Sequence, residues 1–121
     1  MLESKLYSLL TGNAAVALLV GARVYPVKLE QDTDFPAITY QRISGGQQYS
    51  LTAYSNLENP RIQIDVWGLK YSDVKALASK VKTAMEGATT FRATLLTDID
   101  LYEDDVEIYR VSQDWSVWNQ E

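Results

Sequence analysis

The sequence predicts a single α+β domain over residues 1–121, in which helices pack on a mainly antiparallel β-sheet. Three observations support this fold class. Leucines recur at helical spacing near the N-terminus, alternating apolar and polar residues mark strands in both halves of the chain, and an amphipathic helical pattern separates these strands. The expected order is therefore α-α-β-β-α-β-β, which is typical of α+β folds. No linker, internal repeat or low-complexity tract divides the chain.

The first quarter of the chain predicts two short helices. Leucines at positions 2, 6, 9 and 10 share one helical face, and Thr11-Gly12-Asn13 ends that helix and offers Asn13 as the N-cap of the next one. Residues 14–19 are good helix formers and Gly21 ends the second helix, which we expect to pack on the first. Val24-Tyr25-Pro26 then leads out in an extended conformation.

Two strands are expected in the middle of the chain. A polar loop over residues 30–35 ends at Pro36, which disfavours helical backbone in the preceding residue. The β-forming residues of 37–44 make the first strand, with Ile38, Tyr40 and Arg42 on one face. After Pro60, apolar positions 62, 64 and 66 alternate with polar positions 63 and 65 and with Trp67, which predicts the second strand.

An amphipathic helix and a hairpin are expected in the last part of the chain. Ser72 is the expected N-cap, apolar positions 74, 77, 78, 81 and 85 form the buried stripe, and Gly87 supplies the position after the helix. Lysines 75, 80 and 82 lie off this stripe. Strands over 95–102 and 107–118 are joined by the turn Glu103-Asp104-Asp105. In the last strand, Val111, Gln113 and Trp115 share one face.

Composition excludes several classes of function. The chain has no cysteine and no histidine, which removes thiolate chemistry, serine–histidine catalysis and the usual zinc ligands. Its 11 basic and 16 acidic residues give a net charge of −5, so sequence-specific nucleic-acid binding is not expected. The apolar run over residues 14–20 is far shorter than the roughly 20 residues of a membrane span, so neither membrane insertion nor an export signal is expected.

An acidic cluster is the strongest charge feature of the chain. Within ten positions it contains Asp98, Asp100, Glu103, Asp104, Asp105 and Glu107, and no basic residue. The spacing does not fit an EF-hand loop, because Tyr102 stands where the third ligand belongs. Asp98 and Asp100 point the same way from one strand, so they can hold a hard cation only if a partner strand adds a carboxylate. The alternative is a solvated acidic hairpin.

No residue pattern predicts catalysis. Carboxylates at positions 65, 98, 100 and 114 leave a small carboxylate-dependent enzyme open as an alternative, but nothing selects a pair among them. Gly45-Gly46 is not part of a phosphate-binding motif. We therefore expect no catalytic, cofactor-binding or metal site and no cofactor.

Residues 45–59 form a long polar stretch with aromatic residues in it. We predict a partner-binding loop there, formed by Gln47, Gln48, Tyr49, Tyr54 and Asn56, because long loops in compact domains are often functional. A plain extended hairpin is the alternative. Trp67 and Trp118 point away from the apolar face of their strands, so each is either covered on the second face of the sheet or part of an interface.

Seven blocks of sequence follow one another along nearly the whole chain. They are residues 6–15, 21–26, 35–43 and 61–67, a helix opening at Tyr71, residues 101–103 and residues 109–118. In this order they resemble the tail-completion (tail-terminator) proteins of long-tailed bacteriophages and prophages.

The resemblance implies a non-enzymatic structural subunit. Such a subunit forms a homo-hexameric ring on the completed tail tube, stops its polymerisation and presents a surface to the head. The implied partners are other copies of the chain, the major tail tube protein and the head connector or stopper protein. The implied location is the virion tail at the head–tail joint, after synthesis in the host bacterial cytoplasm. In such a ring we expect the acidic cluster to face the lumen and repel DNA.

Three other functions stay open at this point. The chain can be a head-side stopper or adaptor at the same joint, or a bacterial adaptor domain recruited from a prophage. The small carboxylate-dependent enzyme is the alternative from a different class.

Overall fold

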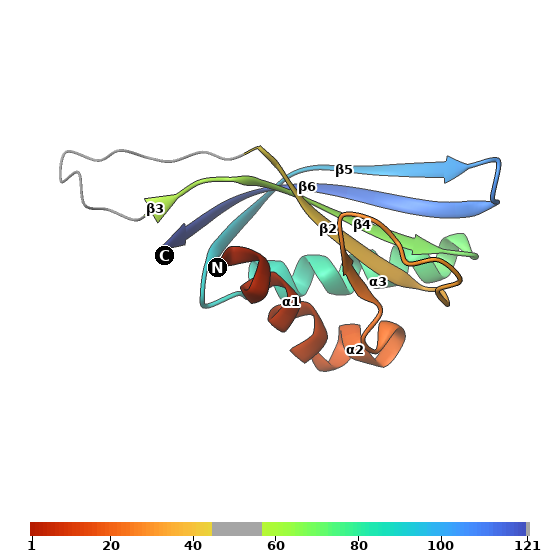
Figure 1. Ribbon diagram of the computed structural model, residues 1–121, viewed down its shortest axis with the longest axis horizontal. Coiled ribbons are helices and arrows are strands. Elements are labelled where there is room, and N and C mark those ends of the chain that lie inside the picture. The colour runs from red at the N-terminus through yellow and green to blue at the C-terminus, as the bar shows by residue number, and fades with distance from the viewer. Residues whose placement is uncertain (45–56, 121) are drawn as a thin grey trace.

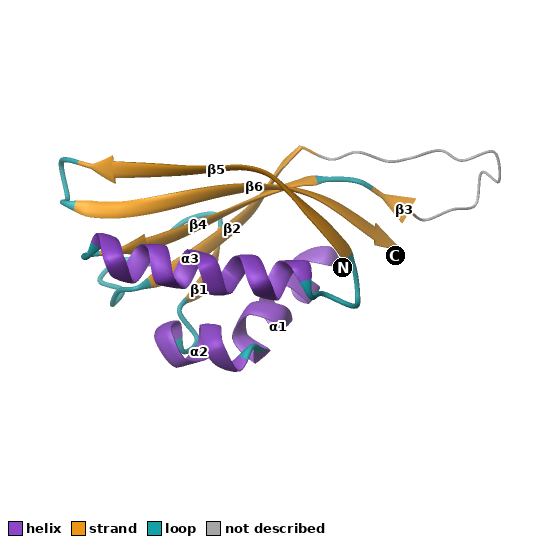
Figure 2. Cartoon of the chain, turned by 180° about the vertical axis from the view of Figure 1, so that it is seen from behind, coloured by secondary structure: helices purple, strands orange, loops and turns teal. Residues whose placement is uncertain are grey.

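A mainly antiparallel sheet lies against three helices in the computed structural model, which describes residues 1–44 and 57–120 (Figure 1). The helices are α1 (Leu2–Gly12), α2 (Ala14–Val20) and α3 (Tyr71–Glu86). The strands are β1 (Val24–Pro26), β2 (Ala37–Ser44), β3 (Leu57–Glu58), β4 (Arg61–Gly68), β5 (Arg92–Glu103) and β6 (Ile108–Gln120). All three helices cover the same face of the sheet (Figure 2). The predicted α+β class and the order of its main elements are confirmed, and β1 and β3 are short additional strands.

The sheet is built around β6. Its order is β1-β2-β4-β6, with β5 on the far side of β6, and every pairing is antiparallel except that of β1 with β2. Strand β3 pairs with the end of β6 in the same register as β4, so the two strands form one line interrupted at residues 59 and 60. There the Asn59 side chain donates to the Val117 carbonyl at 2.8 Å and takes the place of a ladder bond. The strand that comes last in chain order thus lies inside the sheet, between β4 and β5.

The core lies between the sheet and the helices. Alternation along β4 and β6 aims Ile62, Ile64, Val66, Val111, Trp115 and Val117 at the helices, and all are buried. Against them pack leucines 2, 6 and 10 of α1 and the apolar stripe of α3, at positions 74, 77, 81 and 85. Each side chain of this size contributes about 1.5–3 kcal/mol when it is fully buried. The predicted apolar faces are confirmed.

The helix ends confirm one predicted cap and correct another. Asn13 Oδ1 accepts from the backbone N–H groups of Ala15 and Val16, both at 3.1 Å, and is the N-cap of α2 as predicted. The prediction of Ser72 as the N-cap of α3 is wrong, because the helix begins at Tyr71 and has Lys70 as an N-cap without a side-chain hydrogen bond. Gly87 follows α3 as predicted, although its φ of −91° does not require glycine.

The hairpin strands are longer than predicted. Strand β5 begins at Arg92, because Ala93 and Leu95 pack against the core and extend the ladder. Strand β6 runs on to Gln120 because β3 pairs with its end. Among the described residues, none of the helices combines the length and the apolar character that crossing a membrane requires.

Candidate functional site

The sheet face opposite the helices, called the uncovered face below, carries a polar cluster around Trp67. The indole N–H of Trp67 donates to Thr39 Oγ1 at 3.0 Å, and the guanidinium carbon of Arg110 lies 4.9 Å from the centre of its ring. Stacking of a guanidinium on an indole is a favourable cation–π contact. Trp67 is half-buried on the second face of the sheet, and the exposed part of its ring is available for the interface that the sequence offered as the other alternative.

Asp65 and Arg110 form the charged centre of this cluster. Asp65 is buried, its Oδ2 accepts from Gln63 Nε2 at 2.8 Å, and Arg110 Nη1 lies 3.7 Å from the same oxygen. The other end of the guanidinium lies 2.9 Å from Glu103 Oε1. Within the described residues, Asp65 Oδ1 and Arg110 Nε have no hydrogen-bond partner. Because an unpaired buried charge is costly, the Asp65 carboxylate and the Arg110 guanidinium each offset the desolvation cost of the other.

The acidic cluster divides into three groups. Asp98 and Asp100 lie on the helix side of β5, opposite Gln113 and Val111 of β6. Glu103 lies on the uncovered face with Arg110. The remaining acids, at positions 104, 105 and 107, belong to the exposed turn between the strands. The structure thus does not gather the six carboxylates on one surface.

Asp100 joins the hairpin to α3. Its Oδ2 accepts from the hydroxyl of Tyr71 at 2.6 Å and its Oδ1 accepts from Lys75 Nζ at 3.0 Å. These two hydrogen bonds hold the pKa of Asp100 below its ordinary value, and they raise the pKa of Tyr71 and the pKa of Lys75. Tyr71 also contacts the ring of Tyr109, with ring centres 5.7 Å apart. Contacts with the hairpin therefore draw residue 71 into the helix, which explains why α3 begins before Ser72.

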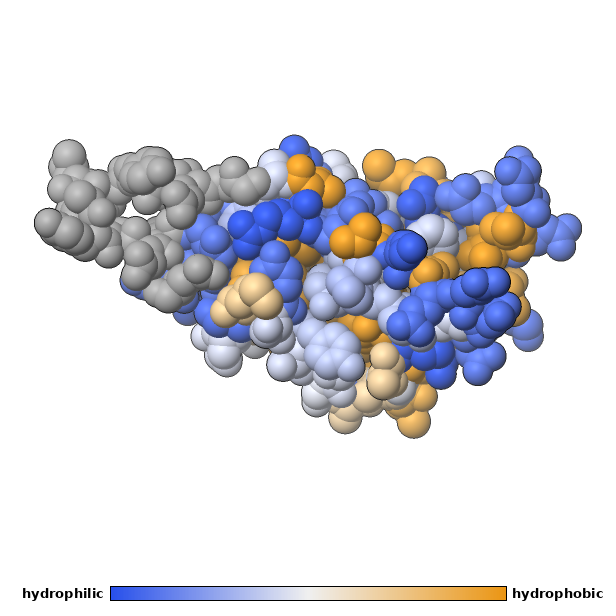
Figure 3. Space-filling model, in the orientation of Figure 1, coloured by the Kyte–Doolittle hydropathy of each residue, from blue (hydrophilic) through white to orange (hydrophobic). Residues whose placement is uncertain are grey.

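Residues 98–110 form a well-anchored projection, called the hairpin arm below. The tilted rings of Tyr102 and Tyr109 contact each other on its helix side, with centres 4.8 Å apart, while the pair of Arg110 and Glu103 holds its other side. The arm nevertheless exposes apolar side chains, with Ile99 at 51% and Val106 at 60% exposure. Figure 3 shows apolar surface interspersed with hydrophilic surface at this end of the molecule. These exposed apolar side chains are available for contact with another protein.

The carboxylates considered for catalysis or metal binding do not come together. Asp65 and Asp114 lie on the uncovered face, where Asp114 pairs with Arg61, whereas Asp98 and Asp100 lie on the other face. Strand β6 offers no carboxylate opposite Asp98 or Asp100, which the cation hypothesis required. In residues 1–44 and 57–120, no group of three or more metal-ligating side chains is placed to hold an ion.

The predicted partner-binding loop, formed by Gln47, Gln48, Tyr49, Tyr54 and Asn56, lies outside the described residues. Trp118, the other tryptophan that the sequence left open, is 39% exposed on β6.

Lys5 is a structural residue that sequence reasoning missed. Its ammonium donates to Asn119 Oδ1 at 2.5 Å, to the Gln120 carbonyl at 3.2 Å and to the Thr90 carbonyl at 3.4 Å. It thereby ties α1 to the end of β6 and to the loop after α3. The partners are at least 85 positions away in the chain, so no local pattern signals them. The contacts of Tyr71 with Asp100 and of Arg110 with Trp67 were missed for the same reason.

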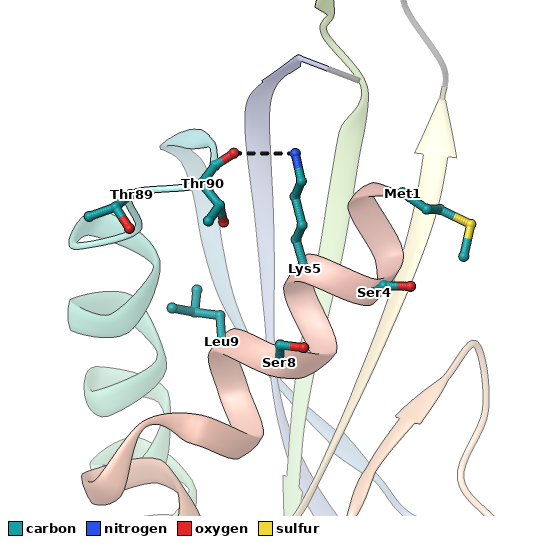
Figure 4. Close-up of a pocket in the computed structure, with 7 residues that line it drawn as sticks. All are labelled: Met1, Ser4, Lys5, Ser8, Leu9, Thr89 and Thr90. Carbon is teal, nitrogen blue, oxygen red and sulfur yellow. Dashed lines mark hydrogen bonds between the residues drawn. The ribbon is translucent and has the colours of Figure 1, made fainter.

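Lys5 also borders a hollow of about 480 Å³, called the α1 hollow below. Figure 4 shows Ser4, Lys5, Ser8 and Leu9 of α1 on one side of it and Thr89 and Thr90 on the other.

Comparisons with known proteins agree with this geometry. The family model described as tail completion protein gp17 matches residues 4–120. A chain in the structure of the virion of a native gene transfer agent particle has the same fold, with a TM-score of 0.80 at 17% sequence identity, over 99% of this chain and 95% of that one. No curated protein sequence matches the chain. The sequence-based resemblance is confirmed, and the chain belongs to the tail completion protein gp17 family of structural phage tail proteins.

Proposed function

We propose that the chain is the subunit of a homo-hexameric ring that caps the completed tail tube, stops its polymerisation and provides the surface for head attachment at the head–tail joint. The observation that carries this proposal is the family match, which extends from the first turn of α1 to the last residue of β6. The anchored hairpin arm and its exposed apolar side chains support it, because a rigid protruding surface loses little entropy on assembly.

Capping of tail tubes tests the proposal. Purified protein is added to growing tail tubes of the matching particle, and tube length is measured by negative-stain microscopy. We expect short tubes that end in a ring and that accept heads. If the protein instead remains with DNA-filled heads and leaves tube growth unchanged, it is a head-side stopper and the capping function is refuted.

We also propose that the turn of the hairpin arm faces the lumen of the ring. Three exposed carboxylates, at positions 104, 105 and 107, lie in this turn, and none forms an ion pair within the described residues. Negative charge at the lumen repels passing DNA and keeps it from adhering. Cryo-microscopy of the ring tests this placement, and an arm on the outer rim would overturn it.

The stretch around Tyr49 and Tyr54 keeps its proposed role in binding a partner protein. Replacing both tyrosines by alanine is expected to lower capping while thermal unfolding stays unchanged. An equal loss of capping and of folded protein would contradict that role.

A further inference from the structure

The α1 hollow has the chemistry of an acceptor for acidic groups. Four hydroxyl side chains line it, at positions 4, 8, 89 and 90, together with Lys5 and the apolar Met1 and Leu9. No carboxylate lines it among the described residues. Hydroxyl groups are donors for carboxylate oxygens. The Lys5 ammonium, whose three N–H groups are directed at Asn119, Gln120 and Thr90, contributes positive charge.

The surroundings of the hollow are basic. Arg92 follows Thr90 by two residues, and Lys80 and Lys82 lie in the last two turns of α3, which leads into the same loop. None of these three cations forms an ion pair within the part of the chain that the structure describes. Glu86 is the one carboxylate between positions 76 and 97. Residues 76–97 therefore carry a net charge of 3 − 1 = +2. Glu3, beside Ser4 on α1, pairs with Arg42.

The loop between β1 and β2, residues 27–36 and called the acidic loop below, has the opposite character. Glu30, Asp32 and Asp34 are exposed against one exposed cation, Lys28, so the loop has a net charge of 1 − 3 = −2. Within residues 1–44 and 57–120 its three acids form no ion pair. Val27 adds an apolar side chain that is 66% exposed. The loop is also held in shape, since the Val27 N–H donates to the Tyr40 carbonyl at 2.8 Å.

These two surfaces lie toward opposite ends of the domain. The acidic loop lies toward the end from which the hairpin arm projects, whereas α1 begins, and β5 follows α3, toward the other end (Figures 1 and 2). A closed ring needs two different and complementary patches on each subunit, because each copy meets its two neighbours through different surfaces. Opposite charges at opposite ends meet this requirement.

We infer that the acidic loop of one copy docks on the α1 hollow and the basic surface around it in the next copy, so that subunits join head to tail. This inference rests on the proposed ring. Charge complementarity selects a second copy as the occupant, and the same surfaces repel their own kind, which disfavours head-to-head pairing. The hairpin turn is also acidic, but in the proposed ring it faces the lumen.

Cross-linking tests the contact, because the natural chain has no cysteine. The variant Ser8→Cys/Gln31→Cys places one thiol at the hollow and one in the acidic loop. On capped tail tubes, a short bis-maleimide is expected to produce a ladder from dimer up to the closed ring. Each single variant is expected to remain monomeric on denaturing gels. The matched pair Ser8→Cys/Asp105→Cys, with its second thiol in the hairpin turn, is expected to give no ladder.

Charge reversal gives an independent test. The variants Glu30→Lys/Asp34→Lys and Asp104→Lys/Asp105→Lys both change the net charge from −5 to −1, since two reversals add four charges. We expect the first to weaken subunit association by about tenfold or more and the second to leave it unchanged. Adding Ser8→Glu and Arg92→Glu to the first variant restores opposite charges at the contact and is expected to restore association.

The outcomes separate this inference from the proposed function. If the Ser8→Cys/Gln31→Cys variant caps tubes but gives no ladder, the inferred contact is wrong and the proposed capping function is unaffected. A ladder in the Ser8/Asp105 variant overturns both this contact and the lumenal placement of the arm. Wild-type protein that neither caps tubes nor associates refutes the proposed ring itself.

Discussion

Gln113 occupies a fully buried position on β6 where an apolar residue would fit the pattern of its neighbours. Its Nε2 donates to the Ala78 carbonyl of α3 at 3.0 Å, and its Oε1 accepts from the indole N–H of Trp115 at 3.1 Å. The substitution Gln113→Leu keeps a similar volume and removes both bonds. The indole N–H then stays buried without its acceptor, and such a donor costs about 1–3 kcal/mol. We expect the variant to lose that much of the free energy of unfolding.

A double-mutant cycle isolates the bond between the two side chains. Trp115→Phe removes the indole N–H, so Gln113→Leu made in that background no longer creates an unpaired donor. Its cost there is expected to be smaller than in the wild type by about 1–3 kcal/mol. With a urea m-value of about 2 kcal/mol/M, that difference corresponds to roughly 0.5–1.5 M in the midpoint of unfolding.

Urea unfolding followed by tryptophan fluorescence and by circular dichroism measures all four proteins of the cycle. Gln41→Leu serves as the control. Gln41 lies on the uncovered face, and its side-chain amide makes no hydrogen bond within the described residues. We expect it to change stability by less than about 0.5 kcal/mol. Equal costs of Gln113→Leu in the wild-type and Trp115→Phe backgrounds would refute the reasoning.

Three further substitutions test the packing, a helix cap and an exposed ion pair. In Gly68→Ala the new Cβ lies 2.6 Å from Val74 Cγ2, so we expect a loss of about 1–3 kcal/mol from overpacking, measured by urea unfolding; an unchanged midpoint would contradict it. Asn13→Ala removes the N-cap of α2 and is expected to cost about 0.5–2 kcal/mol in thermal unfolding, with Asn13→Ser restoring most of the loss. Asp100→Asn breaks the exposed pair with Lys75, which is expected to cost less than about 1 kcal/mol at neutral pH. The pKa of Asp100 is lowered from 3.8, so the ion pair stabilises the fold above that pH, and this stabilisation is lost as the pH falls through the lowered pKa. The stabilities of the variant and the wild type should therefore converge in acid. A difference that stays constant with pH would argue against the pair.

The elements with a periodic apolar pattern were predictable, because burial of only one face of a strand or helix produces that pattern in the sequence. The alternation after Pro60 gave the β4 strand and its inward face, and the stripe from Val74 to Met85 gave α3. Asn13 was also found, because an N-cap acts on the two or three residues next to it. These features depend on local sequence, which is the information that a single chain provides.

Periodicity alone placed the N-cap of α3 at Ser72, although the family resemblance indicated a helix opening at Tyr71. The contacts of Tyr71 and the division of the acidic cluster between surfaces both depend on segments that are distant in the chain. Tyr71 enters the helix because Asp100 and Tyr109 hold it, and both lie about 30 or more positions further along the chain. The acidic cluster looked like one surface in the sequence, but strand alternation and the turn separate its members between two faces and a tip. Arg110 shows the same limit, because only the register of β4 with β6 brings it to Trp67 and Asp65.

The position of β6 between β4 and β5 has a consequence for how the protein forms during synthesis. Strands β3, β4 and β5 all pair with β6, and β5 has no other strand partner among the described residues. A nascent chain that has not yet produced residues 108–120 therefore lacks Trp115 and the strand that joins β5 to β4. Helices and the β2–β4 ladder can form earlier, but the non-local pairings that close the core must wait for β6. Truncated or stalled chains thus leave the edges of β4 and β5 unpaired, and a strand of a neighbouring copy can pair with them. Completion of β6 is therefore the step that protects the subunit from premature association.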